Sequence, residues 1–95
     1  MNTRAHPQAY RVPFRLEREP ALNVYRIINA GDEPVHGLTL TLHGAGLMRA
    51  SIPSLLPPKH ALEVTVMGHD LPRNTILVVR WFRPDGVEYL WRVSF

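Results

Sequence analysis

Apolar and polar side chains alternate with a period of two along several short stretches of this chain. The clearest case is residues 35–43, where three leucines alternate with Thr39, Thr41 and His43. Successive side chains of a β-strand point to opposite sides, so this pattern predicts a strand with one face buried in the core and one face exposed to solvent. Shorter or weaker runs of the same kind lie at residues 10–18, 22–28, 47–52 and 61–67.

Residues 74–95 predict a β-hairpin. Two β-rich runs flank Pro84, Asp85 and Gly86, a sequence typical of a tight turn in which glycine takes a left-handed conformation. If Arg83 faces Val87, one face of the hairpin is almost wholly apolar and aromatic. The register then pairs Trp81 with Tyr89, Val79 with Trp91 and Leu77 with Val93. A slip by one residue would move both tryptophans to the mixed face, which favours this register.

These strands predict an all-β fold. No stretch has a helical period, and turn signals separate the strands. We therefore expect one Ig-like antiparallel β-sandwich of about seven strands with Greek-key connections over residues 10–95, after a flexible tail at residues 1–9. Pro13 predicts that the first strand lies at a sheet edge. The predicted core is Val12, Phe14, Leu38, Leu40, Leu42, Leu62, Val64, Val66, Leu77, Val79, Trp81, Tyr89, Trp91 and Val93.

Two details of the core stay open. In residues 22–28, Leu22 and Val24 lie on one side of the strand, while Tyr25 and Ile27 lie on the other. Either pair could face the core, depending on a bulge or a change of facing near Val24. In the proline-rich loop 53–58, Leu55 or Leu56 is expected to close one end of the core.

Composition excludes several classes of protein. The chain has 95 residues and no cysteine, which excludes disulfides and thiol nucleophiles. No run of about 18 apolar residues could span a membrane, and residues 1–10 lack the apolar segment of a signal peptide. A cytoplasmic location is the expectation. The formal net charge is +3, and Lys59 is the only lysine. Because the arginines are dispersed, nucleic acid is an unlikely partner.

One set of segments resembles a known family. The segments are Tyr25–Gly31, Pro34, Leu38–Leu42, Leu56–Pro58 and Leu62–Val66. Together they resemble bacterial Ig-like modules, including CARDB-like and related adhesion-associated domains, over residues 22–95. Lys59 departs from the pattern, because such modules often have glycine there. The resemblance implies a non-enzymatic module that faces protein or carbohydrate, and it transfers no site residue.

No catalytic or metal-binding constellation is visible. His6, His36, His43, His60 and His69 lack the spacing of zinc ligands, so we expect no metal and no cofactor. The serines lack the context of a nucleophile elbow, and Gly44-Ala45-Gly46 lacks the lysine and helix of a phosphate-binding loop. We therefore do not expect an enzyme.

The mixed face of the final hairpin is the candidate interaction surface. It combines arginines with aromatic and aliphatic side chains, as interface cores do, and the strand at residues 35–43 is expected to extend it. The candidate residues are Arg80, Phe82, Leu90, Arg92, Thr41 and His43. This surface could bind a protein or a second copy of the chain. It could equally be a solvated face with arginine stems covering apolar surface, or it could stack a sugar or base.

Two further modes of binding are also open. A small-ligand or carbohydrate-binding module would need an aromatic pocket, formed where Tyr10, Tyr25 or the loop 53–58 meets one end of the sandwich. An exposed sheet edge would accept a strand from a partner or from a second copy.

Overall fold

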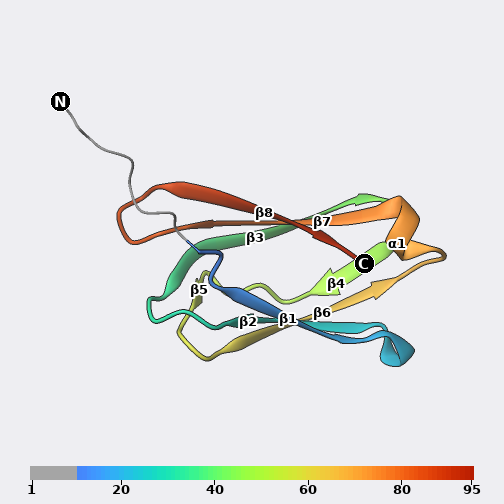
Figure 1. The fold of residues 1–95 in the computed structure, drawn as a ribbon, viewed down its shortest axis with the longest axis horizontal. Helices are drawn as coiled ribbons and strands as arrows, with labels where there is room; N and C mark the ends of the chain where they lie inside the picture. Colours follow the sequence, from blue (N-terminus) through green and yellow to red (C-terminus); the bar gives the residue numbers. More distant parts are fainter. Residues whose placement is uncertain (1–10) are drawn as a thin grey trace.

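The computed structural model, described here for residues 11–95, consists of two antiparallel four-stranded sheets (Figure 1). Sheet A has the order β1 (Phe14–Glu19), β2 (Val24–Asn29), β6 (Ala61–Met67), β4 (Leu47–Ala50). Sheet B has the order β5 (Leu55–Leu56), β3 (Val35–Gly44), β7 (Thr75–Phe82), β8 (Glu88–Ser94). A 3-10 turn, η1 (Pro20–Leu22), and a short helix, α1 (Leu71–Asn74), lie in loops. The predicted all-β sandwich is confirmed, and the predicted tail lies outside the described residues.

Most connections cross from one sheet to the other. Only the β1–β2 and β7–β8 hairpins stay within a sheet, while each of the other connections changes layer. As a result, β2 pairs along its length with β6, which is distant in sequence. β1 is an edge strand that begins directly after Pro13, as predicted, because proline cannot donate a backbone hydrogen bond to a second neighbour.

The final hairpin has the predicted register. Trp81 pairs with Tyr89, Val79 with Trp91 and Leu77 with Val93. The Arg83 amide donates to the Val87 carbonyl at 3.0 Å, and Gly86 takes a φ of 86° in the turn. The Asp85 carboxylate accepts a hydrogen bond from the Val87 amide at 2.9 Å. The turn chemistry and the alternation of the strands therefore specify the same pairing.

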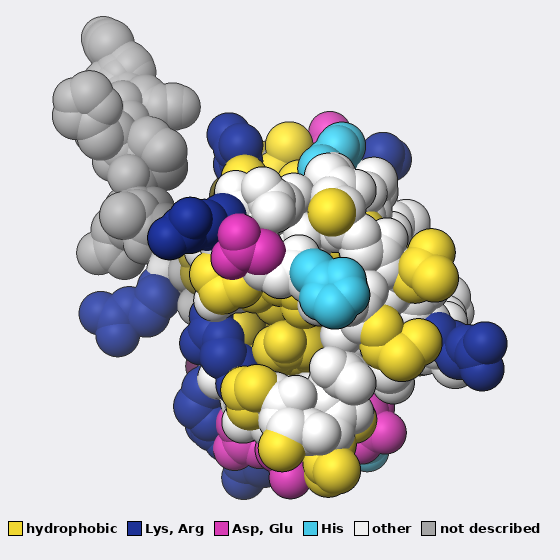
Figure 2. Space-filling view, turned by 90° about the vertical axis from the view of Figure 1, so that its right-hand side faces the viewer, with side chains coloured by type: hydrophobic (Ala, Val, Ile, Leu, Met, Phe, Trp, Pro, Cys, Tyr) yellow, Lys and Arg dark blue, Asp and Glu magenta, His cyan; other side chains and the backbone are white. Residues whose placement is uncertain are grey.

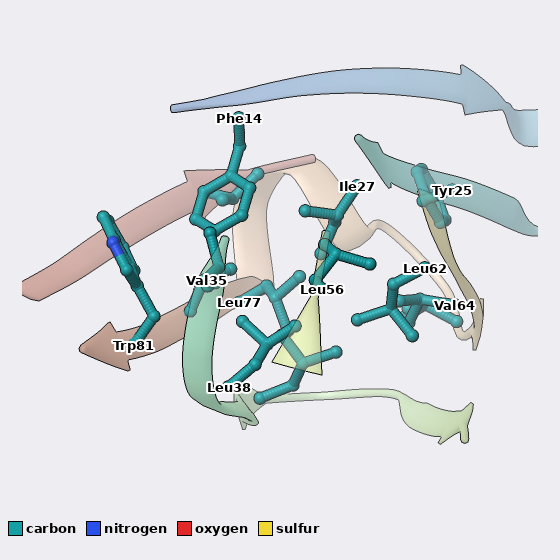
Figure 3. Close-up of a cluster of buried hydrophobic side chains, with 14 of the residues drawn as sticks. Phe14, Tyr25, Ile27, Val35, Leu38, Leu56, Leu62, Val64, Leu77 and Trp81 are labelled. Atoms are coloured by element: carbon teal, nitrogen blue, oxygen red, sulfur yellow. The ribbon is translucent and has the colours of Figure 1, made fainter. Parts of the chain in front are cut away.

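The core lies between the two sheets and draws on both (Figure 3). Phe14 of sheet A meets Trp81 of sheet B edge-to-face, with ring centroids 4.8 Å apart. The buried side chains are Phe14, Tyr25, Ile27, Val35, Leu38, Leu40, Leu56, Leu62, Val64, Val66, Leu71, Leu77, Val79, Trp81 and Val93. Leu42, Tyr89 and Trp91 of the predicted core are only partly buried and pack against this cluster.

The structure corrects one core assignment and settles the open ones. Val12 is 38% exposed, because the sheet begins only at Phe14 and Val12 lies beyond it. Tyr25 and Ile27 face the core, whereas Leu22 belongs to η1 and is 65% exposed. Leu56, rather than Leu55, is buried at one end of the core.

A buried asparagine joins the loops at one end of the sandwich. The Asn29 side-chain amide donates to the carbonyls of Glu33 and Leu56, both at 3.0 Å. Its side-chain oxygen accepts from the Gly31 amide at 3.0 Å. All of its side-chain hydrogen-bonding groups therefore have partners, which makes its complete burial tolerable.

Candidate functional site

Strands β3, β7 and β8 form the upper layer in Figure 1, and their outward side chains form one continuous surface, here called the β3–β7–β8 face. The strand registers arrange these side chains in four rows. The rows are His36–Phe82–Glu88, Thr39–Arg80–Leu90, Thr41–Val78–Arg92 and His43–Ile76–Ser94. All of the predicted candidate residues lie on this face, and β3 pairs with β7 as expected.

Apolar side chains follow the middle strand of this face. Ile76, Val78 and Phe82 of β7 are half-buried by their neighbours on the sheet. Leu90, on β8, is 61% exposed. The sequence places Ile76 and Val78 on the same side as Arg80, because they share its strand parity, but the candidate interaction residues did not include them.

Arg80 is fixed at the centre of the face by two contacts. Its guanidinium lies over the Phe82 ring, 5.5 Å from the centroid, and it forms an ion pair with Glu88. A guanidinium stacked on an aromatic ring and paired with a carboxylate presents a pre-ordered donor group beside an apolar surface. Arg92, two rows of β8 away from Glu88, forms no ion pair with any residue of the described range.

A backbone irregularity places Phe82. The β3–β7 register shifts between His36 and Thr39, and Gly37 within this bulge has a φ of 57°. A Cβ atom at Gly37 would lie only 2.8 Å from Cδ1 of Phe82. The ring thus rests directly on the Gly37 backbone, which only glycine permits at this distance.

The outer face of sheet A has a different character. Arg26 of β2 forms ion pairs with Glu19 at 2.9 Å and with Glu63 at 3.5 Å. Arg15 lies 3.8 Å from Glu17 on β1. These ion pairs lie on the β1–β2–β6 side of the face. On the β4 side, Arg49 forms no ion pair within residues 11–95, and Leu47 and Met67 are 72% and 50% exposed. The two outer faces of the sandwich therefore differ in one respect: within residues 11–95, the β3–β7–β8 face carries an outward aromatic side chain, Phe82, with an arginine stacked on it, and the outer face of sheet A carries none.

The positions proposed for a ligand pocket are less suitable. A hollow of about 280 Å³ lies at the end of the sandwich shown in Figure 2, beside Tyr25, Asp70 and Phe95. The Tyr25 ring is only 5% exposed and packs edge-to-face against Phe95, with centroids 5.0 Å apart. Its ring face is therefore occupied by core contacts. A second hollow, along the loop that begins at Ser51, contains no aromatic lining residue, and Tyr10 lies outside the described residues.

The histidines are dispersed over the molecule. His36 and His43 occupy opposite ends of the β3–β7–β8 face, and the His60 ring contacts the Pro58 carbonyl at 3.2 Å. Within residues 11–95, no three histidine, cysteine or acidic side chains are grouped as possible metal ligands. Neither helical segment of that range is long and apolar enough to cross a bilayer.

No family model, curated protein or solved structure matches the chain. The resemblance to bacterial Ig-like modules therefore stays a prediction. One backbone observation bears on it: Lys59, at the position where that pattern expects glycine, has a φ of 68°. This is the left-handed conformation that glycine adopts most readily.

Proposed function

We propose that this chain is a non-catalytic protein-interaction module that binds its partner through the β3–β7–β8 face. The observation that carries the proposal is the contrast between the two outer faces. The outer face of sheet A pairs Arg15 and Arg26 with carboxylates and carries no aromatic side chain in residues 11–95, whereas sheet B exposes Leu90 beside the stacked Arg80–Phe82 pair. Arginine, aromatic and aliphatic side chains at the centre of a patch are the composition of interface hot spots.

The surface also has the rigidity that favours binding. Its side chains project from paired strands rather than from loops, and Phe82 is fixed by the Gly37 backbone and the Arg80 guanidinium. Side chains that are already ordered lose less conformational entropy when they enter an interface. As part of the same proposal we place the module in the cytoplasm, a location with which the absence of cysteine is compatible.

The test is a comparison of two double variants. In Arg80→Ser/Phe82→Thr the centre of the proposed surface is removed. The matched control is Arg15→Ser/Ile28→Thr, which removes a cross-strand pair of similar composition from the outer face of sheet A. Proteins retained by the immobilised wild-type chain from a cell extract are identified, and their affinities for all three chains are measured by titration.

We expect the Arg80/Phe82 variant to bind such a partner at least about tenfold more weakly, because it loses two anchor side chains, while the control binds like wild type. Thermal unfolding of each variant verifies that it is folded. Equal affinities for the Arg80/Phe82 variant and the wild type would place the binding surface elsewhere.

A further inference from the structure

The exposed edge of β8 differs from the other sheet edges of the described chain. β1 lies between Pro13 and Pro20, β4 has four residues, and β5 has two. Short length and flanking prolines are ways in which proteins prevent further strand pairing. β8 has seven residues without glycine or proline, and its pairing with β7 runs without a register shift. It is thus the edge best suited to accept another strand.

The backbone groups that β8 offers follow from its register. The Arg83 amide donates to the Val87 carbonyl, so odd-numbered residues of β8 direct their backbone groups toward β7. The amides and carbonyls of Glu88, Leu90 and Arg92 consequently point away from the sheet. The Ser94 carbonyl supports this direction, because it accepts a hydrogen bond at 2.9 Å from Arg18 of β1 in the other sheet. That contact also occupies the last carbonyl of the edge.

We propose that β8 pairs antiparallel with β8 of a second copy of this chain, about a two-fold axis at Leu90. In this register Glu88 lies directly opposite Arg92 of the second copy, and Leu90 lies opposite its own equivalent. The residues that face each other are also those whose backbone groups are available for hydrogen bonds. Charge therefore favours a second copy of β8 as the partner strand, because an antiparallel copy places its Arg92 opposite Glu88 and its Glu88 opposite Arg92.

Other symmetric registers lack this match. An axis at Arg92 would place two arginines opposite each other, and an axis at Glu88 would place two glutamates opposite each other. Like charges in directly opposed positions destabilise strand pairing. An axis between Leu90 and Arg92 would place Glu88 opposite Ser94, whose carbonyl already accepts the bond from Arg18. Leu90 is the centre that twice places Glu88, which also pairs with Arg80 of its own chain, opposite an arginine of the other copy, and it keeps the Arg18 contact.

This inference rests on the proposed function, because it names a second copy of the chain as one partner of sheet B. It uses the edge of the sheet, whereas the proposed function uses its outer face. Pairing of the two β8 strands would join the sheets B of both copies and place their β3–β7–β8 faces side by side on one continuous surface. A larger surface of this kind would then be presented to a further protein.

The experiment is sedimentation velocity on the full chain and on two charge-reversal variants, Glu88→Arg and Arg92→Glu, over concentrations up to about 1 mM. Each variant alone places like charges opposite each other twice in the dimer, and we expect its dimer dissociation constant to rise about tenfold or more. In an equimolar mixture, the arginine introduced at position 88 of one copy faces the glutamate introduced at position 92 of the other, and Arg92 of the first copy faces Glu88 of the second, so both pairs join opposite charges. The mixture should therefore dimerise about as well as wild type.

Glu63→Arg is the matched control, because Glu63 is also an exposed carboxylate paired with an arginine, on the outer face of sheet A. It should leave the dimer unchanged. A monomeric wild type throughout the concentration range, or a mixture that stays as weak as the single variants, would overturn the β8 pairing. The two proposals can be tested separately. If the wild type is monomeric but its partner binding depends on Arg80 and Phe82, only the β8 pairing is refuted.

If the chain dimerises through β8 but its partner binding does not depend on these two residues, only the proposed role of the β3–β7–β8 face is refuted.

Discussion

Glu33 is a side chain that makes the stability of the fold depend on pH. It lies in the loop between β2 and β3, where its carboxylate receives two hydrogen bonds from Arg83, at 2.8 Å from Nε and 3.3 Å from Nη2. The hydrogen bond from Arg83 is the main cause that holds the pKa of Glu33 below its ordinary value of 4.5, against a smaller opposing effect of desolvation. These two hydrogen bonds connect the loop between β2 and β3 with the turn end of the β7–β8 hairpin.

The variant Glu33→Gln tests this coupling. A carboxyl whose folded-state pKa is lowered stabilises the protein above its unfolded-state pKa, and this stabilisation is lost as the pH falls through the folded-state value. We therefore expect wild type to be more stable than the variant by about 1 kcal/mol at neutral pH. The difference should shrink from about pH 4.5 downward. Chemical denaturation at a series of pH values measures it, and a difference that persists undiminished at low pH would contradict the assigned cause.

At the scale of the element, the bulge in β3 shapes the proposed binding surface. The register of β3 against β7 shifts between His36 and Thr39, where the Phe82 ring packs on the β3 backbone. Gly37 lies within the shift, where it has a positive φ and no Cβ atom to clash with the ring. The pattern of residues 35–43 marks this shift only indirectly: Val35 is out of phase with Leu38, Leu40 and Leu42, and the shift lets both Val35 and Leu38 be buried. The contact of the Phe82 ring with Gly37 is visible only in the tertiary structure.

Gly37→Ala should therefore destabilise the protein and move Phe82. The expected cost is about 1–3 kcal/mol, since the substitution adds both the strain of a positive φ and a contact of the new Cβ with the ring. Gly86→Ala is the control: its φ is also positive, but a Cβ there would have no neighbour within 4 Å. Thermal unfolding and NMR shifts of the Phe82 ring measure both effects. Equal costs and an unmoved ring would show that the contact is unimportant.

At the scale of the whole molecule, the two sheets are held together by apolar packing and by Asn29. The aromatic contact between Phe14 and Trp81 crosses the core, and the Asn29 amide of β2 reaches the Leu56 carbonyl of β5. The first contact is non-directional and supplies buried area. The second is directional and fixes where the end of sheet B sits on sheet A, because a buried carbonyl without a donor is costly.

Asn29→Asp keeps the shape of the side chain but replaces its donor group with an oxygen. One buried and one partly buried carbonyl would lose their donor and face a carboxylate, so we expect a loss of about 3 kcal/mol or more at pH 7. Because burial raises the pKa of such a carboxyl, the loss should become smaller at acidic pH, where the protonated form can donate. Asn74→Asp, at an exposed position, is the control. Equal denaturation midpoints for both variants would contradict this role of Asn29.

The candidate surface could be predicted only in part. The parity of β7 and β8 determines that Arg80, Phe82, Leu90 and Arg92 share a face, because the hairpin is local and its turn fixes the register. The sequence did not reveal which side chains share the outer face of sheet A, since Arg26 meets Glu63 only through the pairing of β2 with β6. The contrast on which the proposed function depends is therefore a property of the tertiary structure.

By itself, the sequence determined seven of the eight strands, the Pro84–Gly86 hairpin with its register, and the all-β fold, because alternation and turn chemistry act over a few residues. It did not predict β5, because its two residues are too few to show alternation and lie in a segment that was expected to be a loop. The tertiary structure decided that Tyr25 and Ile27 face the core, that Val12 does not, and how β2, β6 and β4 pair across long connections. The physical reason is that residues 22–28 carry apolar side chains on both sides of the strand. The local sequence therefore hardly favours either side for the core, and the facing that buries more apolar surface against the other sheet is the one adopted.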